Sequence, residues 1–72
     1  MEEFMYLGLR CVEGISAATF FGRFGTYIDS VYGEQLEKDI EQGLIEQDGD
    51  RYRLTERGLD VSNVVLSGFL LG

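Results

Sequence analysis

The sequence of 72 residues predicts a mainly α-helical fold with one small β-hairpin. Apolar residues recur every three or four positions in four segments, which is typical of amphipathic helices. An Asp-Gly pair at positions 48 and 49 lies between two short alternating segments, which is a strong local signal for a hairpin. A chain of this length buries one hydrophobic core, so we expect a single domain over residues 1–72.

The first helix is expected over residues 2–10. Its two opening carboxylates suit the positive end of the helix macrodipole. Phe4, Leu7 and Cys11 recur at helical spacing and predict one apolar face, and Gly14 breaks the segment. Because Cys11 lies in an apolar stretch, we expect a packed and unreactive thiol.

The second helix is expected between Ser16, a good N-cap residue, and Gly25, a natural C′ residue. Its apolar stripe predicts a face turned toward the core. The residues of that stripe are Ala17, Phe20, Phe21 and Phe24.

A third helix follows a short connection through Tyr27 and Ile28. Apolar residues recur every four positions on one face, and four acids occupy most of the others, where we expect solvent to reach them. The apolar positions are Tyr32, Leu36 and Ile40, and the acidic ones are Glu34, Glu37, Asp39 and Glu41. Gly43 is the expected C′ residue, followed by the hydrophobic contact of a Schellman motif.

The hairpin is expected from residues 45–47 and 50–54, with Tyr52 and Leu54 on one face and Arg51 and Arg53 on the other. The order of three helices, a β-wing and a C-terminal helix is that of a winged-helix-like domain.

The last helix is expected to begin after the cap Thr55 and to run to about Leu71, with Gly58 allowing another backbone to approach closely. Two apolar stripes point in different directions along it. One consists of Leu59, Leu66, Phe69 and Leu70, and the other of Val61, Val64 and Val65. We expect a body outside this chain to cover the second stripe, and the alternatives are a frayed end or a homodimer of the isolated chain.

Composition excludes several chemistries. The chain has no histidine and one cysteine, so histidine-based catalysis, an internal disulfide and a multi-cysteine metal site are ruled out. Seven of the thirteen acids fall in residues 34–50, where Lys38 is the only base, so nucleic-acid binding through the third helix is disfavoured. No apolar run is long enough to span a bilayer and no secretory signal is present, so we expect a cytoplasmic protein without membrane contact.

Several stretches together resemble a known family. These are EFMYLGLRCVEGIS, FFGRFG, EQGLIEQDGDRYRLTERGLDVSNVV and the closing FL. They are similar to the C-terminal domain of oxygen-independent coproporphyrinogen III oxidase-like proteins. In that family the domain follows a radical S-adenosylmethionine barrel, so the resemblance implies that the iron–sulfur cluster and S-adenosylmethionine belong to a parent protein and that this segment holds no cofactor.

The resemblance also implies a function for the parent. The family contains anaerobic oxidases of porphyrin biosynthesis and relatives that bind and deliver haem, and the EFMYLGLR opening looks more like the second group. This chain would then be an accessory domain that packs on the barrel and is not catalytic alone, with the tetrapyrrole handled by the parent. The alternative is a free-standing winged-helix regulator that binds DNA or protein.

We expect the first and last helices to face the barrel. The contact candidates are Met5, Leu9, Arg10, Val64 and Phe69. Arg10 either pairs with a barrel carboxylate or is a solvated arginine, and the sequence leaves both open.

Overall fold

The computed structural model describes residues 2–69 as five helices and three short strands. In chain order they are α1 (Glu2–Leu9), β1 (Ile15–Ser16), α2 (Ala17–Phe24), α3 (Ile28–Glu41), β2 (Ile45–Asp48), β3 (Arg51–Leu54), α4 (Glu56–Asp60) and α5 (Ser62–Ser67). The predicted class, mainly helical with a small hairpin, is confirmed, and the order of the elements is compatible with a winged-helix-like arrangement. No helix in this part of the chain is long and apolar enough to cross a membrane.

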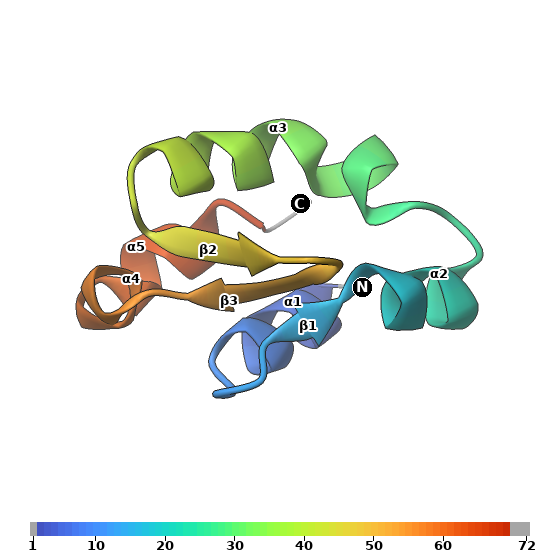
Figure 1. Ribbon diagram of the computed structural model, residues 1–72, viewed down its shortest axis with the longest axis horizontal. Helices are drawn as coiled ribbons and strands as arrows, with labels where there is room; N and C mark the ends of the chain where they lie inside the picture. The colour runs from blue at the N-terminus through green and yellow to red at the C-terminus, as the bar shows by residue number, and fades with distance from the viewer. Residues whose placement is uncertain (1, 70–72) are drawn as a thin grey trace.

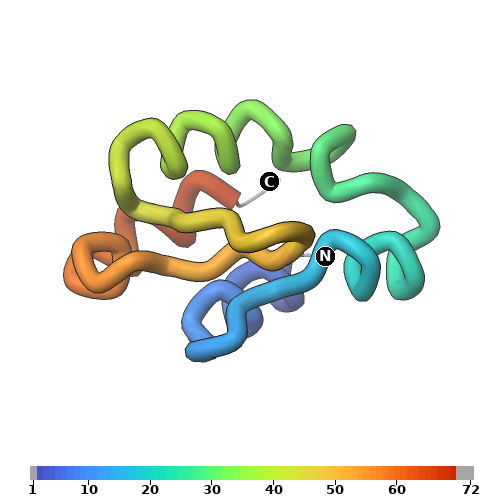
Figure 2. Tube along the Cα trace, in the orientation of Figure 1, coloured from blue at the N-terminus to red at the C-terminus, as the bar shows by residue number. Residues whose placement is uncertain are grey.

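The strands form one antiparallel sheet in the order β1-β3-β2, so β3 is central. Figure 1 shows α3 at the top of the view beside β2 and α1 lower down near β1, with α4 and α5 at one end. The trace in Figure 2 shows the turn after α1 bringing β1 back beside β3, where Ile15 pairs with Tyr52. Strand β1 was not predicted, because two residues are too short to show an alternating pattern.

The hairpin turn lies one residue later than the sequence suggested. Asp48 pairs with Arg51, so Gly49 and Asp50 form the loop, and Gly49 has a φ of +64° that favours glycine. The Asp50 carboxylate accepts hydrogen bonds from the Ser16 hydroxyl (2.8 Å) and the Ala18 N–H (3.3 Å). Ser16 itself caps α2 as predicted, because its Oγ accepts from the Thr19 N–H. The tip of the hairpin therefore stabilises the start of α2.

The hydrophobic core takes side chains from every helix except α4. Its members are Met5, Leu9, Ile15, Phe20, Ile28, Tyr32, Leu36, Ile45, Tyr52, Leu54, Val65, Leu66 and Phe69. Tyr52 and Leu54 share the buried face of β3 as predicted. The prediction of a packed thiol was wrong, since Cys11 is exposed, and Leu7, on the apolar stripe predicted for α1, is 56% exposed. Both sides of this short helix are apolar, so spacing alone did not choose between them.

Helix α3 begins at Ile28, which was expected in the connection before the helix and is instead part of its buried side. Asp39 was expected in solvent but is only 3% exposed. Burial raises the pKa of the Asp39 carboxyl, although Gln35 Nε2 donates to both of its oxygens at 3.1–3.2 Å. The helix ends in the predicted Schellman motif, with Gly43 N–H bonded to the Ile40 carbonyl and Leu44 N–H to that of Asp39.

The predicted single last helix is wrong, because the chain divides into α4 and α5 at Val61, whose φ of −119° is not helical. The predicted cap is confirmed, since Thr55 Oγ1 accepts from the Gly58 N–H. So is the close approach at Gly58, where an added Cβ would lie 2.0 Å from the Leu44 carbonyl oxygen. The part of the predicted stripe at Leu70 falls outside the described residues.

Candidate docking surface

Exposed apolar side chains are concentrated on α1, the turn after it, and the α4–α5 segment. We call this set the apolar face, and it consists of Tyr6, Leu7, Val12, Leu59, Val61 and Val64. Two further exposed aromatic residues lie elsewhere, Tyr27 and Phe21, and the prediction that Phe21 faces the core was wrong, since it is 43% exposed. Their ring centroids are 4.8 Å apart. Monomeric proteins rarely leave large apolar side chains grouped in water, so the apolar face is the part of this surface best suited to a partner.

The α4–α5 segment supplies half of this face. Val64 and Val65 are neighbours in α5 and lie about 100° apart around its axis, and Val65 is 2% exposed while Val64 is 71% exposed. Val61 is 40% exposed and Leu59, on α4, is 50% exposed. The expectation of uncovered valines at this end is therefore correct for Val61 and Val64 and wrong for Val65, which belongs to the core.

The five predicted contact residues divide into two groups. Arg10 and Val64 are exposed, as a contact requires. Met5, Leu9 and Phe69 are buried in the core, with exposed fractions of 0–2%, and they cannot touch a partner unless the domain opens. On α1 the most exposed apolar residue is Leu7, which was not among the predicted contacts. Met5 and Leu9 are four positions apart and share a side of the helix, whereas Leu7, midway between them, points away.

Arg10 is held against its own helix. Its guanidinium carbon lies 5.6 Å from the centre of the Tyr6 ring, a cation–π distance. A groove between the turn after α1 and the start of α4 is lined by Val12 and Leu59 of the apolar face, together with charged residues that include Arg10, Arg53 and Glu56.

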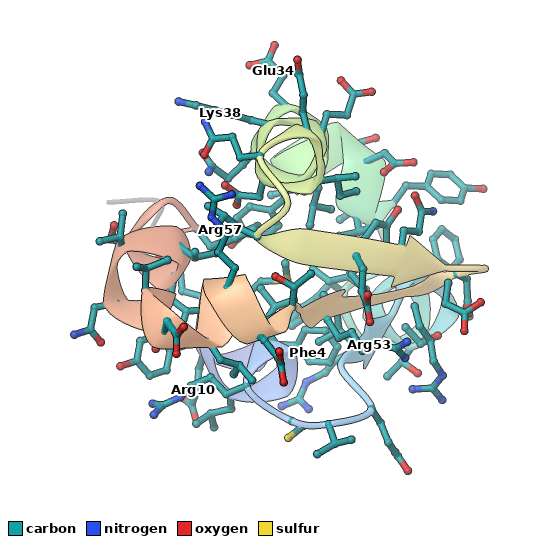
Figure 3. The ribbon with its side chains drawn as sticks, turned by 60° about the vertical axis from the view of Figure 1, so that its left-hand side comes forward. Phe4, Arg10, Glu34, Lys38, Arg53 and Arg57 are labelled. Atoms are coloured by element: carbon teal, nitrogen blue, oxygen red, sulfur yellow. The ribbon has the colours of Figure 1, made fainter. Side chains whose placement is uncertain are left out.

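The acidic surface lies on the other side of the molecule. Glu34, Glu37 and Glu41 are exposed on α3. Figure 3 shows Glu34 and Lys38 at the top of the view and Arg10 and Phe4 at the bottom, with the sheet between them. The apolar face is therefore separated from the most strongly charged helix, and a partner can approach it without burying those carboxylates.

Within the described residues, no three or more Cys, Asp or Glu side chains are grouped to hold a metal ion. Cys11 is exposed instead of packed, and its Sγ lies 3.4 Å from the Leu7 carbonyl oxygen. One thiol does not fit an iron–sulfur cluster, which takes several cysteine ligands. The carboxyls with shifted pKa values have structural partners: Asp39 binds Gln35, and hydrogen bonds from Ser16 and Ala18 lower the pKa of Asp50.

Residues 1–61 match the family described as the HemN C-terminal domain. The chain is 37% identical over 71 residues to the protein named "Heme chaperone HemW" of Lactococcus lactis subsp. lactis (strain IL1403), covering 99% of this chain and 19% of that protein. It is 34% identical over 70 residues to the protein of the same name from Bacillus subtilis (strain 168), covering 97% of this chain and 18% of that one.

No solved structure matches the chain. The chain spans about a fifth of the length of these curated relatives, and the resemblance inferred from its sequence motifs is confirmed. It belongs to the HemN C-terminal domain family.

Proposed function

We propose that this chain is an accessory domain that packs through its apolar face on the body of a longer haem chaperone of the radical S-adenosylmethionine type. The observation that carries the proposal is the exposure of Leu7 and Val64, at 56% and 71%, together with the other exposed side chains of the apolar face. The partner in this proposal is the rest of the parent protein, since about four fifths of each relative lies outside the segment that matches this chain. Residues 1–72 act as one unit in this proposal.

In this role the domain performs no chemistry. The parent holds the iron–sulfur cluster, S-adenosylmethionine and the haem that it delivers, and a parent that oxidises coproporphyrinogen is the less favoured form because both relatives are named as chaperones. The cytoplasmic location stays a prediction. The alternative role as a DNA-binding regulator is disfavoured by Glu34, Glu37 and Glu41, which would repel a duplex from α3.

A chimeric protein tests the docking. In it, this chain replaces the segment of the Bacillus subtilis chaperone that aligns with it. Docked domains unfold together, so we expect one calorimetric transition for the chimera. The variants Leu7→Glu and Val64→Glu should release a second transition at the melting temperature of the isolated chain, because a buried unpaired carboxylate is strongly unfavourable at an interface.

Tyr27→Glu is the matched control, since Tyr27 is exposed but lies outside the apolar face. It should leave the single transition intact. Because Leu7 and Val64 are exposed, neither substitution should unfold the isolated chain. A separate transition in the unaltered chimera would overturn the proposal, and a dimeric isolated chain in light scattering that is lost in Leu7→Glu would assign the face to a homodimer instead.

A further inference from the structure

A second surface feature adjoins the apolar face. It is a groove of about 410 Å³ between α1 and the β1–α2 segment, and we call it the α1–α2 groove. Phe4, Leu7 and Ile15 are among its apolar lining residues. Arg23, from α2, and Arg51, from β3, also line it. A concave apolar site that also carries two cationic groups from separate elements can recognise a partner by both shape and charge.

Neither guanidinium group forms a salt bridge within residues 2–69, although Arg51, after the hydrogen bonds from Ser16 and Ala18, helps to lower the pKa of the Asp50 carboxyl. Arg23 lies 5.8 Å from the ring centres of Phe4 and Phe24, so its planar group rests on aromatic faces. Arg51 Nη1 donates to the Glu13 carbonyl oxygen at 3.5 Å, which is an uncharged partner. The ion pair found among residues 2–69 joins Arg53 to Glu46 and involves neither of them. Two positioned cations thus remain available to a carboxylate from elsewhere.

Because the chain as a whole is acidic, the two arginines indicate where an anionic partner can bind. The net charge is −7, and the exposed acids of α3 face the opposite side of the sheet (Figure 3). Glu3 is the acidic residue that lines the α1–α2 groove, against two arginines. An anionic partner would be repelled by most of this molecule and attracted here. The charge pattern therefore favours an anionic partner and favours its binding at the α1–α2 groove.

From these observations we propose that the α1–α2 groove receives an acidic, amphipathic segment of the parent body, with an apolar side chain against Phe4 and Leu7 and carboxylates on Arg23 and Arg51. This rests on the proposed function and specifies the chemistry of the surface that the domain meets. Leu7 belongs both to the apolar face and to the groove, so one docking event covers both. Arg23 and Arg51 fix the register of the bound segment, and the apolar residues of the groove supply most of the affinity.

The test measures, in the chimeric protein, how fast hydroxyl radicals modify the Leu7 side chain. Arg23→Gln and Arg51→Gln should each raise the undocked fraction about two- to fivefold, the effect of losing one exposed ion pair. Arg23→Lys should retain most of the docking because it keeps the charge. Lys38→Gln is the control, since it removes one cation from α3 on the far side. Raising the salt concentration from about 50 to about 500 mM should weaken docking in the unaltered chimera and hardly at all in the double variant.

The outcomes separate the two proposals. If Leu7 is as reactive in the unaltered chimera as in the isolated chain, docking itself fails. If Leu7 is protected and the arginine variants behave like Lys38→Gln, the groove inference alone fails. A third outcome also overturns it: mesoporphyrin, which carries two propionates, binds the isolated chain in an absorbance titration and the double arginine variant abolishes this binding while docking is unchanged. The groove would then be a site for a small dicarboxylate.

Discussion

Helix α4 packs closely on the connection between α3 and β2 because Gly58 has no side chain. Gly58 is buried, and an added Cβ would lie 2.0 Å from the Leu44 carbonyl oxygen and 3.3 Å from Leu54 Cδ2. The backbone of the α3–β2 connection is tied down here by the Thr55 N–H bond to the same carbonyl. The contact therefore cannot relax by turning a flexible side chain.

We predict that Gly58→Ala lowers the free energy of unfolding by about 1–3 kcal/mol, the usual range for overpacking. The measurement is urea unfolding of the isolated chain. Gly22→Ala is the matched control, because Gly22 lies inside α2 with nothing within 4 Å of an added Cβ. That change should stabilise the chain by about 0.5–1 kcal/mol. Equal effects at the two positions would contradict the packing described for α4.

Asp39 gives a second prediction at this scale, and it concerns pH. Burial raises the pKa of this carboxyl in the folded chain, so folding favours its protonated form. Its contribution to stability is present below the pKa of the unfolded state, about 3.9, and is lost as pH rises through the higher folded value. The amide introduced by Asp39→Asn would have no charge to bury and would keep one acceptor for Gln35.

We therefore expect Asp39→Asn to gain stability relative to the unaltered chain at neutral pH, and the difference to shrink as pH falls below about 4. Unfolding by urea at a series of pH values measures it. Glu37→Gln, on the exposed side of the same helix, should show no such trend. A difference between Asp39→Asn and the unaltered chain that grows on acidification would show that the ionised carboxylate is the favoured form.

At the scale of elements, the contact between the hairpin tip and α2 is the least expected feature of the fold. Asp50 accepts from the Ser16 hydroxyl and the Ala18 N–H, and these bonds lower its pKa. A lowered folded pKa means that the contribution to stability is present above the unfolded value and is lost as pH falls through the folded one. Because β1 also pairs with β3, the hairpin and the start of α2 form one connected unit.

We predict that Asp50→Asn destabilises the chain at neutral pH and that the destabilisation fades in acid, where the carboxylate of the unaltered chain becomes protonated. Asp48→Asn is the control, as Asp48 is the neighbouring exposed acid on β2. Hydrogen exchange at the first N–H groups of α2 gives a local readout and should accelerate in Asp50→Asn alone. Equal acceleration in both variants would remove the special role of Asp50.

The elements that the sequence predicted well are those with local signals. The caps Ser16 and Thr55, the Schellman glycine Gly43 and the alternating side of β3 depend on neighbouring residues and were found correctly. The two-residue strand β1 depends on a contact between distant segments, the pairing of Ile15 with Tyr52. Spacing within a segment carries no information on such contacts.

The sequence predicted which elements carry the candidate site, but it did not predict correctly which of their residues are exposed. Helix α1 and the C-terminal segment do carry the exposed apolar residues, as expected. The sequence nevertheless assigned Met5 and Leu9 to the partner and did not name Leu7, whereas the structure buries Met5 and Leu9 and exposes Leu7. In a helix of eight residues with apolar side chains on both sides, the choice of core side depends on where the sheet lies, which only the fold determines.

At the scale of the whole molecule, the acidic part of the surface is separated from the apolar part, and a domain without a partner does not need this separation. The acidic helix α3 faces one way, and the apolar face and the α1–α2 groove face another. A small domain gains support from a partner when its own core is limited. The central claim is that the apolar face is covered by the remainder of a longer protein.

Side-chain footprinting by hydroxyl radicals tests this claim most directly, by comparing the isolated chain with the same chain in the chimeric chaperone. We predict that Tyr6, Leu7 and Val64 are modified much more slowly in the chimera, while Tyr27, 66% exposed and outside the apolar face, is modified at the same rate in both. Equal rates for Leu7 and Val64 in the two proteins would contradict the account, because they would show the apolar face still open to water beside its intended partner.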